Sequence, residues 1–241
     1  MNSKMEDKKS IDPKVLEAAK VEYFRPYITE AKVNLLEKVM DQRTRQITVI
    51  LEDVYKPHNA SAVFRNCDCF GLQDLHIINN SSEYEINPNV SKGASNWVSM
   101  HRYEKEGAKN TADCYANLKA QGYTIYATSP NVEGKTLDQV DLSGKVAIAF
   151  GNEADGLSEE ALASADHHLR IPMYGFTESF NISVTTALCL HHLVERLRKE
   201  RKDWHLSEEE RQFLRSVWYT GLVRHADLHI KRIIEELATA K

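Results

Sequence analysis

The feature that most constrains the fold is an alternation of two segment types through the middle of the chain. Short, nearly continuous apolar segments of strand length occur at 46–54, 75–79, 123–129, 145–152 and 167–173. Segments with helical spacing of apolar residues lie between and after them, at 59–71, 111–122, 157–165 and 181–201. Strands that are apolar on both sides and alternate with helices indicate a parallel sheet with helices on both faces. We therefore expect an α/β fold.

The two ends of the chain differ from this centre. Residues 1–46 and 201–241 have helical patterns, and Ser207 with Glu210 forms a capping-box sequence at the start of one of these helices. We expect a central domain at 47–200 with a helical extension on each side. Segment 80–110 has little periodicity and is rich in Asn, Ser and Lys, so it is interpreted as a long functional loop.

Composition excludes several classes of protein. Hydrophobic residues make up 42% and charged residues 27% of the 241, as in ordinary globular chains. No apolar run approaches the roughly 18 residues of a transmembrane helix, and the N-terminus has no apolar secretory segment. The four cysteines and the His-His pairs lack the spacing of a zinc site, so we expect no metal. These observations favour a cytoplasmic protein without a membrane partner.

Charge is distributed unevenly along the chain. The net charge is −4, but basic residues slightly outnumber acidic ones at both ends, whereas acidic residues dominate the centre. The densest basic run, RLRKERK at 196–202, contains Arg196, Arg198 and Lys199. It is interpreted either as a solvated helix face or as a contact with a polyanion.

Three loops that follow predicted strands carry polar residues beside Gly or Pro. The carboxyl ends of strands are where ligands bind in open α/β sheets. After the first strand, Asn59 is either a helix N-cap or a functional residue, and Arg65 is either a surface charge or a functional one. Cys67 falls on the apolar face of the same helix, which argues against a nucleophile.

The other two loops are equally unusual. FGNEADGLSEE (150–160) brackets polar residues between two glycines but matches no nucleotide-binding glycine motif. IPMYGFTESFN (171–181) places four polar side chains before a buried helix, more than an N-cap requires. Together the loops predict a ligand site whose chemistry these patterns leave open.

Three of these segments also carry a family resemblance. VYKPHNASAVFRNCDCFGL (54–72), VAIAFGNEADGLSEE (146–160) and IPMYGFTESFNISVTTAL (171–188) resemble, in order, the three motifs of the SpoU family of RNA ribose 2′-O-methyltransferases. The likeness is greatest to the TrmH members, which methylate guanosine 18 in the D-loop of tRNA. SKGASNWV (91–98) also resembles a loop of this family. The resemblance implies a SPOUT fold with a C-terminal trefoil knot, S-adenosyl-L-methionine as cofactor, tRNA as substrate, and a homodimer.

The resemblance also implies roles for individual residues. The implied catalytic residues are Asn59, Arg65, Glu153, Ser179 and Asn181. The implied cofactor-binding residues are Thr128, Gly151, Ile171, Met173 and Phe180, where Phe180 replaces the Leu usual in relatives. The candidates for RNA binding are His58 and the basic residues Arg196, Arg198 and Lys199.

The role of Arg65 and the identity of the RNA have alternatives. The family mechanism treats the motif arginine as a base, but a guanidinium has a pKa above about 12, so a positioning and electrostatic role is the preferred interpretation. An rRNA 2′-O-methyltransferase of the same family, or a non-catalytic RNA-binding module, are the other hypotheses. The five intact catalytic-motif residues and the short helical N-terminus favour a tRNA methyltransferase.

Overall fold

The computed structural model describes residues 11–81, 93–130 and 132–239. Two compact units are present. The central unit spans Gln42–His205, and the terminal unit combines the described parts of Met1–Asp41 and Leu206–Lys241. Each unit has its own buried residues and is described separately.

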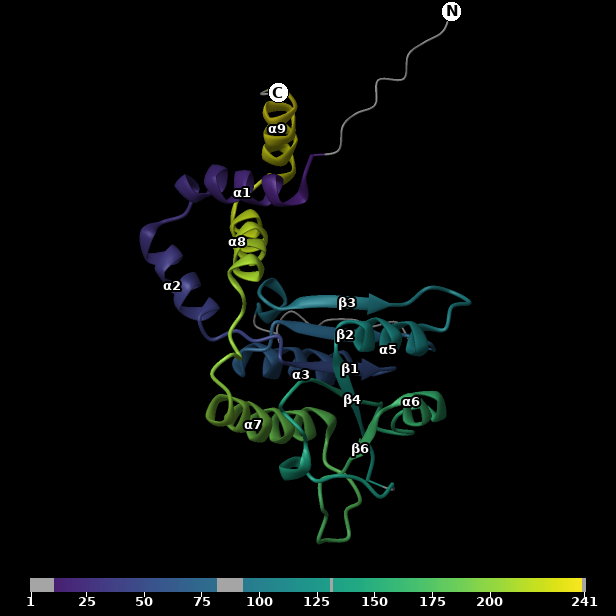
Figure 1. The fold of residues 1–241 in the computed structure, drawn as a ribbon. Coiled ribbons are helices and arrows are strands. Elements are labelled where there is room, and N and C mark those ends of the chain that lie inside the picture. Colours follow the sequence, from purple (N-terminus) through teal and green to yellow (C-terminus); the bar gives the residue numbers. More distant parts are fainter. Residues whose placement is uncertain (1–10, 82–92, 131, 240–241) are drawn as a thin grey trace, which may run out of the picture. The chain divides into compact units, whose positions relative to one another are not determined.

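The central unit is built on a six-stranded parallel sheet (Figure 1). Its strands are β1 (Ile47–Glu52), β2 (Asp74–Ile78), β3 (Ser99–Tyr103), β4 (Tyr123–Thr128), β5 (Lys145–Phe150) and β6 (His167–Leu169). They lie in the order β3-β2-β1-β5-β4-β6, and every neighbouring pair is parallel. The chain first builds outward from β1 to β3 and then crosses to the other side of β1, which creates a switch point between β1 and β5.

Helices cover both faces of this sheet, as expected from the apolar strands. The helices of the unit are α3 (Pro57–Cys69), α5 (Asn110–Ala120), α6 (Glu159–Ser164) and α7 (Ile182–Glu200). One buried cluster joins α3 and α7 to strand residues such as Val49 and Ile148. A second cluster joins α5 and α6 to residues on the opposite side of the same strands, such as Ile50 and Ala149. The α/β prediction with helices on both faces is therefore confirmed.

Most predicted elements are present with small shifts of their ends. Helix α3 ends before Gly71, whose φ of +77° suits glycine, as its position in the sequence predicted. The strand predicted at 167–173 is shorter, because pairing with β4 ends at Leu169. The helix start was also misjudged: α3 begins at Pro57, so the N-cap interpretation of Asn59 is wrong.

The loop interpretation of 80–110 is only partly correct. Residues 93–110 contain a short 3-10 helix, η2 (Ala94–Asn96), and the edge strand β3. The side chains of β3 are exposed or half-buried, so its sequence SMHRY shows no apolar run. Residues 82–92, which include the start of SKGASNWV, lie outside the described residues.

The terminal unit is entirely helical among the described residues. Its helices are α1 (Pro13–Phe24), η1 (Arg25–Tyr27), α2 (Glu30–Met40), α8 (Glu208–Leu222) and α9 (Ala226–Thr239). The predicted capping box of Ser207 and Glu210 opens α8. Arg215 donates hydrogen bonds to Glu37 at 2.7 and 2.9 Å, which links α8 to α2. None of the helices in the described part of the chain is long and apolar enough to cross a membrane.

Candidate functional site

A cavity of about 650 Å³ lies at the carboxyl ends of β4, β5 and β6. Its walls come from the segment after β4, the loop after β5 and the segment between β6 and α7. The residues that line it include Thr128, Phe150, Gly151, Glu153, Leu157, Leu169, Ile171, Met173, Ser179, Phe180, Asn181 and Ile182. Open α/β sheets bind ligands at the carboxyl ends of their strands, next to the switch point, and the cavity lies there.

A chain of hydrogen bonds joins all three sequence motifs beside this cavity. The side-chain nitrogen of Asn59 donates to the Glu153 carboxylate. The side-chain oxygen of Asn59 accepts a bond of 3.2 Å from the side-chain nitrogen of Asn181. Asn59 is buried in α3, whereas Glu153 and Asn181 line the cavity. The side-chain amide of Asn59 thus uses its donor toward one motif and its acceptor toward the other.

The loop that carries Glu153 is held in shape by its own residues. The Asn152 side-chain oxygen accepts from the backbone N–H groups of Ala154 and Asp155, each at 2.8 Å. The backbone of Asn152 also pairs with Gly156. A Cβ at Gly151 would lie 2.0 Å from the Gly156 carbonyl carbon, so only glycine fits there. The loop is therefore a preformed turn that presents Glu153 to Asn59.

The third motif ends in a well-capped helix. The Asn181 side-chain oxygen accepts from the backbone N–H of Ser183 at 2.9 Å and from its hydroxyl at 2.6 Å. Asn66, two turns beyond Asn59 on the same face of α3, donates to the Ser183 carbonyl at 2.8 Å. The predicted start of this helix at Asn181 is confirmed, since Asn181 is its N-cap. One side-chain amide therefore both caps α7 and donates to Asn59.

All five residues predicted to bind a cofactor line the cavity, and so do Glu153, Ser179 and Asn181. The Thr128 hydroxyl donates to the Ala149 carbonyl at 2.8 Å, which ties the end of β4 to β5. Three carboxylates line the cavity, from Glu153, Asp155 and Glu178, against one cation, Lys56. This excess of negative charge favours a ligand that carries positive charge.

Arg65 and His58 lie on α3 but outside the cavity lining. Arg65 follows Asn59 by six positions, which places the two side chains on different sides of the helix. Arg65 is exposed, and its guanidinium forms no hydrogen bond or ion pair with the residues that the structure describes. Its guanidinium is therefore accessible to a ligand from solution.

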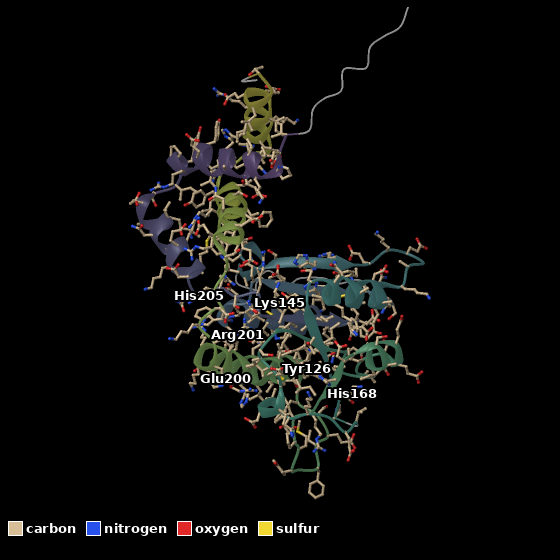
Figure 2. The ribbon with its side chains drawn as sticks, in the orientation of Figure 1. Tyr126, Lys145, His168, Glu200, Arg201 and His205 are labelled. Atoms are coloured by element: carbon tan, nitrogen blue, oxygen red, sulfur yellow. The ribbon has the colours of Figure 1, made fainter. Side chains whose placement is uncertain are left out.

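The basic residues near the end of α7 are not gathered at the cavity. Arg196 pairs with Glu200, which is labelled in Figure 2, and donates to the carbonyls of Leu137 and Val140 at 2.7 and 3.1 Å. Arg198 donates to the Gln42 carbonyl at 3.2 Å. Lys199 is exposed. These bonds give the two arginines structural roles, whereas Lys199 forms only an exposed ion pair with Glu195 at 3.9 Å.

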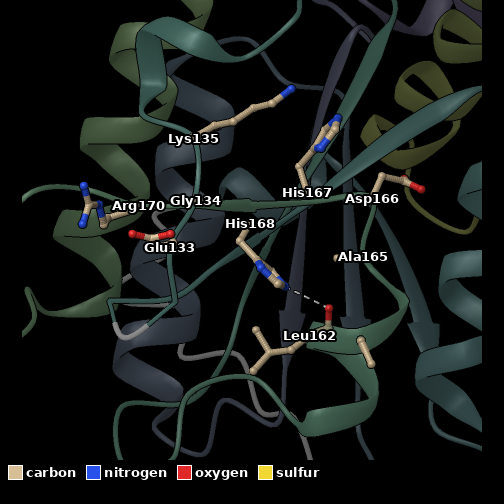
Figure 3. A pocket seen from close by; sticks show the side chains of 10 residues that line it. Glu133, Gly134, Lys135, Leu162, Ala165, Asp166, His167, His168 and Arg170 are labelled. Carbon is tan, nitrogen blue, oxygen red and sulfur yellow. Dashed lines mark hydrogen bonds between the residues drawn. The ribbon is translucent and has the colours of Figure 1, made fainter.

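A second cavity of about 660 Å³ lies along the outer edge of β6 (Figure 3). His168 bonds to the Leu162 carbonyl at 3.1 Å within it, and Lys135 and Arg170 contribute cations beside Glu133 and Asp166. None of the predicted site residues lines this cavity. In the described part of the chain, no cluster of His, Cys, Asp and Glu is arranged to hold a metal ion.

Some residues of the site were not predicted. The side chain of Asn152 accepts from backbone N–H groups, and that of Asn66 donates to a backbone carbonyl. Asn152 stands between Gly151 and Glu153, so its place in a glycine-bracketed turn could have indicated a turn-forming side chain. No sequence signal links Asn66 to Ser183, which is 117 residues away.

Known proteins share both the sequence and the fold. A model of the SpoU rRNA Methylase family matches residues 46–191. The tRNA (guanosine(18)-2′-O)-methyltransferase of Borreliella burgdorferi is 40% identical over 199 residues, which is 83% of this chain and 89% of the relative.

Two solved structures extend the comparison. The TrmH/SpoU tRNA modifying enzyme of A. aeolicus superimposes with a TM-score of 0.71 at 28% identity, over 81% of this chain and 98% of that one. The SpoU methyltransferase AviRb of Streptomyces viridochromogenes, solved in complex with AdoMet, shares the fold at 21% identity and a TM-score of 0.56, over 68% of this chain and 62% of that one. By its motifs, its fold and these matches, the chain belongs to the SpoU methylase family.

Proposed function

We propose that this protein is a tRNA (guanosine(18)-2′-O-)-methyltransferase that uses S-adenosyl-L-methionine. The observation that carries the proposal is the chain of bonds from Glu153 through Asn59 to Asn181, which joins the three family motifs beside one cavity. A module that only binds RNA has no need of this arrangement. The identity of the substrate rests on the relative that methylates guanosine 18.

The cavity suits the cofactor in size and in charge. A volume of about 650 Å³ is typical of small-molecule sites. When bound, S-adenosyl-L-methionine supplies the methyl group for the ribose, and its sulfonium carries positive charge. The three carboxylates of the lining complement that charge. Apolar contacts come from Ile171, Met173 and Phe180, while Gly151 and Thr128 bring backbone and a short side chain to the wall.

The proposed catalytic residues have two tasks, which are to hold the ribose and to stabilise charge on the target nucleotide. Ser179 and Asn181 border the cavity and would hold the ribose, whose 2′-hydroxyl must lie about 3–3.5 Å from the carbon it attacks. Arg65, which is exposed, would bind the phosphate of the target nucleotide and stabilise the negative charge that develops on the ribose oxygen. A guanidinium remains protonated in proteins, so it performs this electrostatic role better than that of a base.

We further propose a C-terminal trefoil knot and a homodimer. The knot would comprise the segment between β6 and α7, whose path defines one wall of the cavity. For the dimer, Val184 and Leu188 form an exposed apolar stripe one turn apart on α7, at 44% and 42% exposure. Light scattering on Val184→Glu with Leu188→Glu should show monomers where the wild type is dimeric, and a monomeric wild type would refute the dimer.

The RNA-binding candidates divide by exposure. His58 and Lys199 are exposed and are proposed to contact the tRNA directly. Arg196 and Arg198 already bond to Glu200, Gln42 and backbone carbonyls, so as proposed tRNA contacts they would exchange some of these bonds for bonds to phosphate. Replacement of Lys199 by Ala should reduce the salt dependence of tRNA binding by about one unit of slope.

The central experiment is methyl transfer with mapping of the product. Purified protein is incubated with methyl-labelled cofactor and a tRNA transcript, and the methylated ribose is located by mass spectrometry. We expect a single 2′-O-methylguanosine at position 18, and no transfer to a transcript with 2′-deoxyguanosine there. Arg65→Ala should remove turnover while it preserves cofactor affinity. Transfer to an rRNA fragment and none to tRNA would establish the alternative rRNA activity.

A further inference from the structure

One buried carboxylate near the site takes no part in the chemistry described above. Glu52 is the last residue of β1, at the carboxyl end of a central strand, and is 2% exposed. Four of the six residues of this strand are apolar, and Glu52 is the charged residue that ends it, although all six are buried. Burial of a carboxyl group is unfavourable unless hydrogen bonds satisfy it, so its partners are informative.

Three hydrogen bonds satisfy this carboxylate. The backbone N–H and the hydroxyl of Ser158 donate to its two oxygens at 2.8 and 2.9 Å. The Thr111 hydroxyl at the start of α5 donates at 2.6 Å, and it accepts in turn from the Asn80 amide at 2.9 Å. One side chain therefore ties together β1, the start of α5, the segment after β2 and the start of α6.

Ser158 stands at the exit of the loop that forms the site. It is the N-cap of α6 and follows directly on the turn that contains Gly151 and Glu153. The entrance of this turn continues from β5, so the sheet holds it in place. The exit has no strand to hold it, and the Glu52 bonds supply that anchor. Asn59, seven residues beyond Glu52, contacts the same turn at Glu153.

We propose that Glu52 is a positioning residue for methyl transfer. It clamps the exit of the turn 151–158, so that Glu153 meets Asn59 and the cavity wall keeps its form. Glu52 does not line the cavity and acts only through this turn. The expected effect of Glu52 on the methyl-transfer rate rests on the proposed function, whereas its expected effect on the turn 151–158 does not.

The test compares Glu52→Ala and Glu52→Gln by three measurements. They are hydrogen exchange of the amides of 151–158 in the cofactor-free protein, the dissociation constant for S-adenosyl-L-methionine by calorimetry, and the single-turnover rate on tRNA. For Glu52→Ala we expect faster exchange in the turn, affinity weakened about tenfold, and a rate lowered about 100-fold, as small misplacements of catalytic groups produce. Glu52→Gln should recover most of each, because its amide accepts from the Ser158 N–H and donates to the two hydroxyls.

Asp74 provides a matched control. Its carboxylate is also buried, accepts from Arg45 at 2.8 Å and contacts His101 at 2.9 Å. Asp74 is the first residue of β2, however, and so lies at the amino-terminal end of the strands, away from the cavity. Asp74→Asn should lower the melting temperature and leave exchange in 151–158, affinity and rate within about twofold. If Glu52→Ala behaves like this control, the positioning role is wrong.

Two further outcomes are also decisive. If Glu52→Ala does not fold, Ser158→Ala removes one of the three bonds, and unchanged exchange, affinity and rate in that variant would overturn the inference. If the wild type transfers no methyl group to tRNA, the proposed function fails. Exchange and cofactor affinity then still decide whether Glu52 anchors the turn.

Discussion

Asn59→Asp is the sharpest perturbation of the site, because it changes one atom group and almost no volume. The carbonyl oxygen that accepts from Asn181 at 3.2 Å is retained. The amide nitrogen that donates to Glu153 becomes an oxygen, so that two carboxylates face one another. The chain of bonds through the three motifs should therefore break at one link only.

The size of the effect follows from this geometry. Two unit charges about 3 Å apart repel by about 5 kcal/mol at an effective dielectric constant of about 20. Glu153 is exposed and can swing into solvent, which reduces the loss of stability to about 1–2 kcal/mol. When Glu153 swings away it leaves the position proposed for it in catalysis, and we expect a fall in single-turnover rate of about 100-fold at pH 8.

Lower pH should partly restore the rate and the stability of Asn59→Asp. Two carboxylates that share a site retain one proton at higher pH than either would alone, and the protonated pair restores a hydrogen bond. The folded variant then binds a proton more tightly than its unfolded chain, so its deficit of stability relative to wild type shrinks as the pH falls.

The assay is the ratio of variant to wild-type single-turnover rates on tRNA, with urea unfolding, between about pH 5.5 and 8. Asn59→Ala is the control, since it removes the amide without adding charge and should give a ratio independent of pH. A flat ratio for Asn59→Asp, equal to that of Asn59→Ala, would show that Asn59 does not work through its bond to Glu153.

Three other properties are expected. Gly151→Ala places a Cβ 2.0 Å from the Gly156 carbonyl carbon, so calorimetry should show a loss of stability of at least about 1–3 kcal/mol and weaker cofactor binding. A variant that binds the cofactor with wild-type affinity would contradict the rigid turn. Burial, aided by the charge of a neighbouring histidine, lowers the pKa of His76 to about 4, so His76 contributes stability above its unfolded pKa near 6.5. That contribution, at most about 3 kcal/mol, should be lost as the pH falls from about 6.5 to 4 in urea titrations, and His76→Gln should flatten the curve. A chromogenic thiol reagent at pH 8 should titrate only Cys69 in the native protein, because the other three thiols are buried with the pKa of each raised to about 12.

The periodicity of the chain predicts most of the central unit. Apolar runs such as 46–54 and 145–152 became β1 and β5, because strands covered on both faces must be apolar on both sides. Strand β3 was missed for the same reason. It lies at the edge of the sheet with half-buried and exposed side chains, so its apolar content is too low to reveal it.

The site was predictable only as a set of motifs, not as a geometry. Asn59 contacts residues 94 and 122 positions away, and no local pattern encodes such pairs. The N-cap interpretation of Asn59 failed because α3 begins two residues earlier, at Pro57, and a cap immediately precedes the first residue of its helix. The roles of Arg196 and Arg198 were equally hidden, because their carbonyl partners lie in distant loops.

The strand order also has a consequence for synthesis of the protein. Strands β1, β2 and β3 are neighbours in both chain and sheet, so they can pair as soon as they leave the ribosome. The other side of β1 is completed by β5, which emerges about 100 residues later, or about 5–20 seconds at ordinary rates of translation. Throughout that interval the nascent chain presents an unpaired apolar strand edge, the form of backbone most prone to intermolecular pairing. Chaperone binding to nascent chains should therefore be strongest between completion of β3 and emergence of β5.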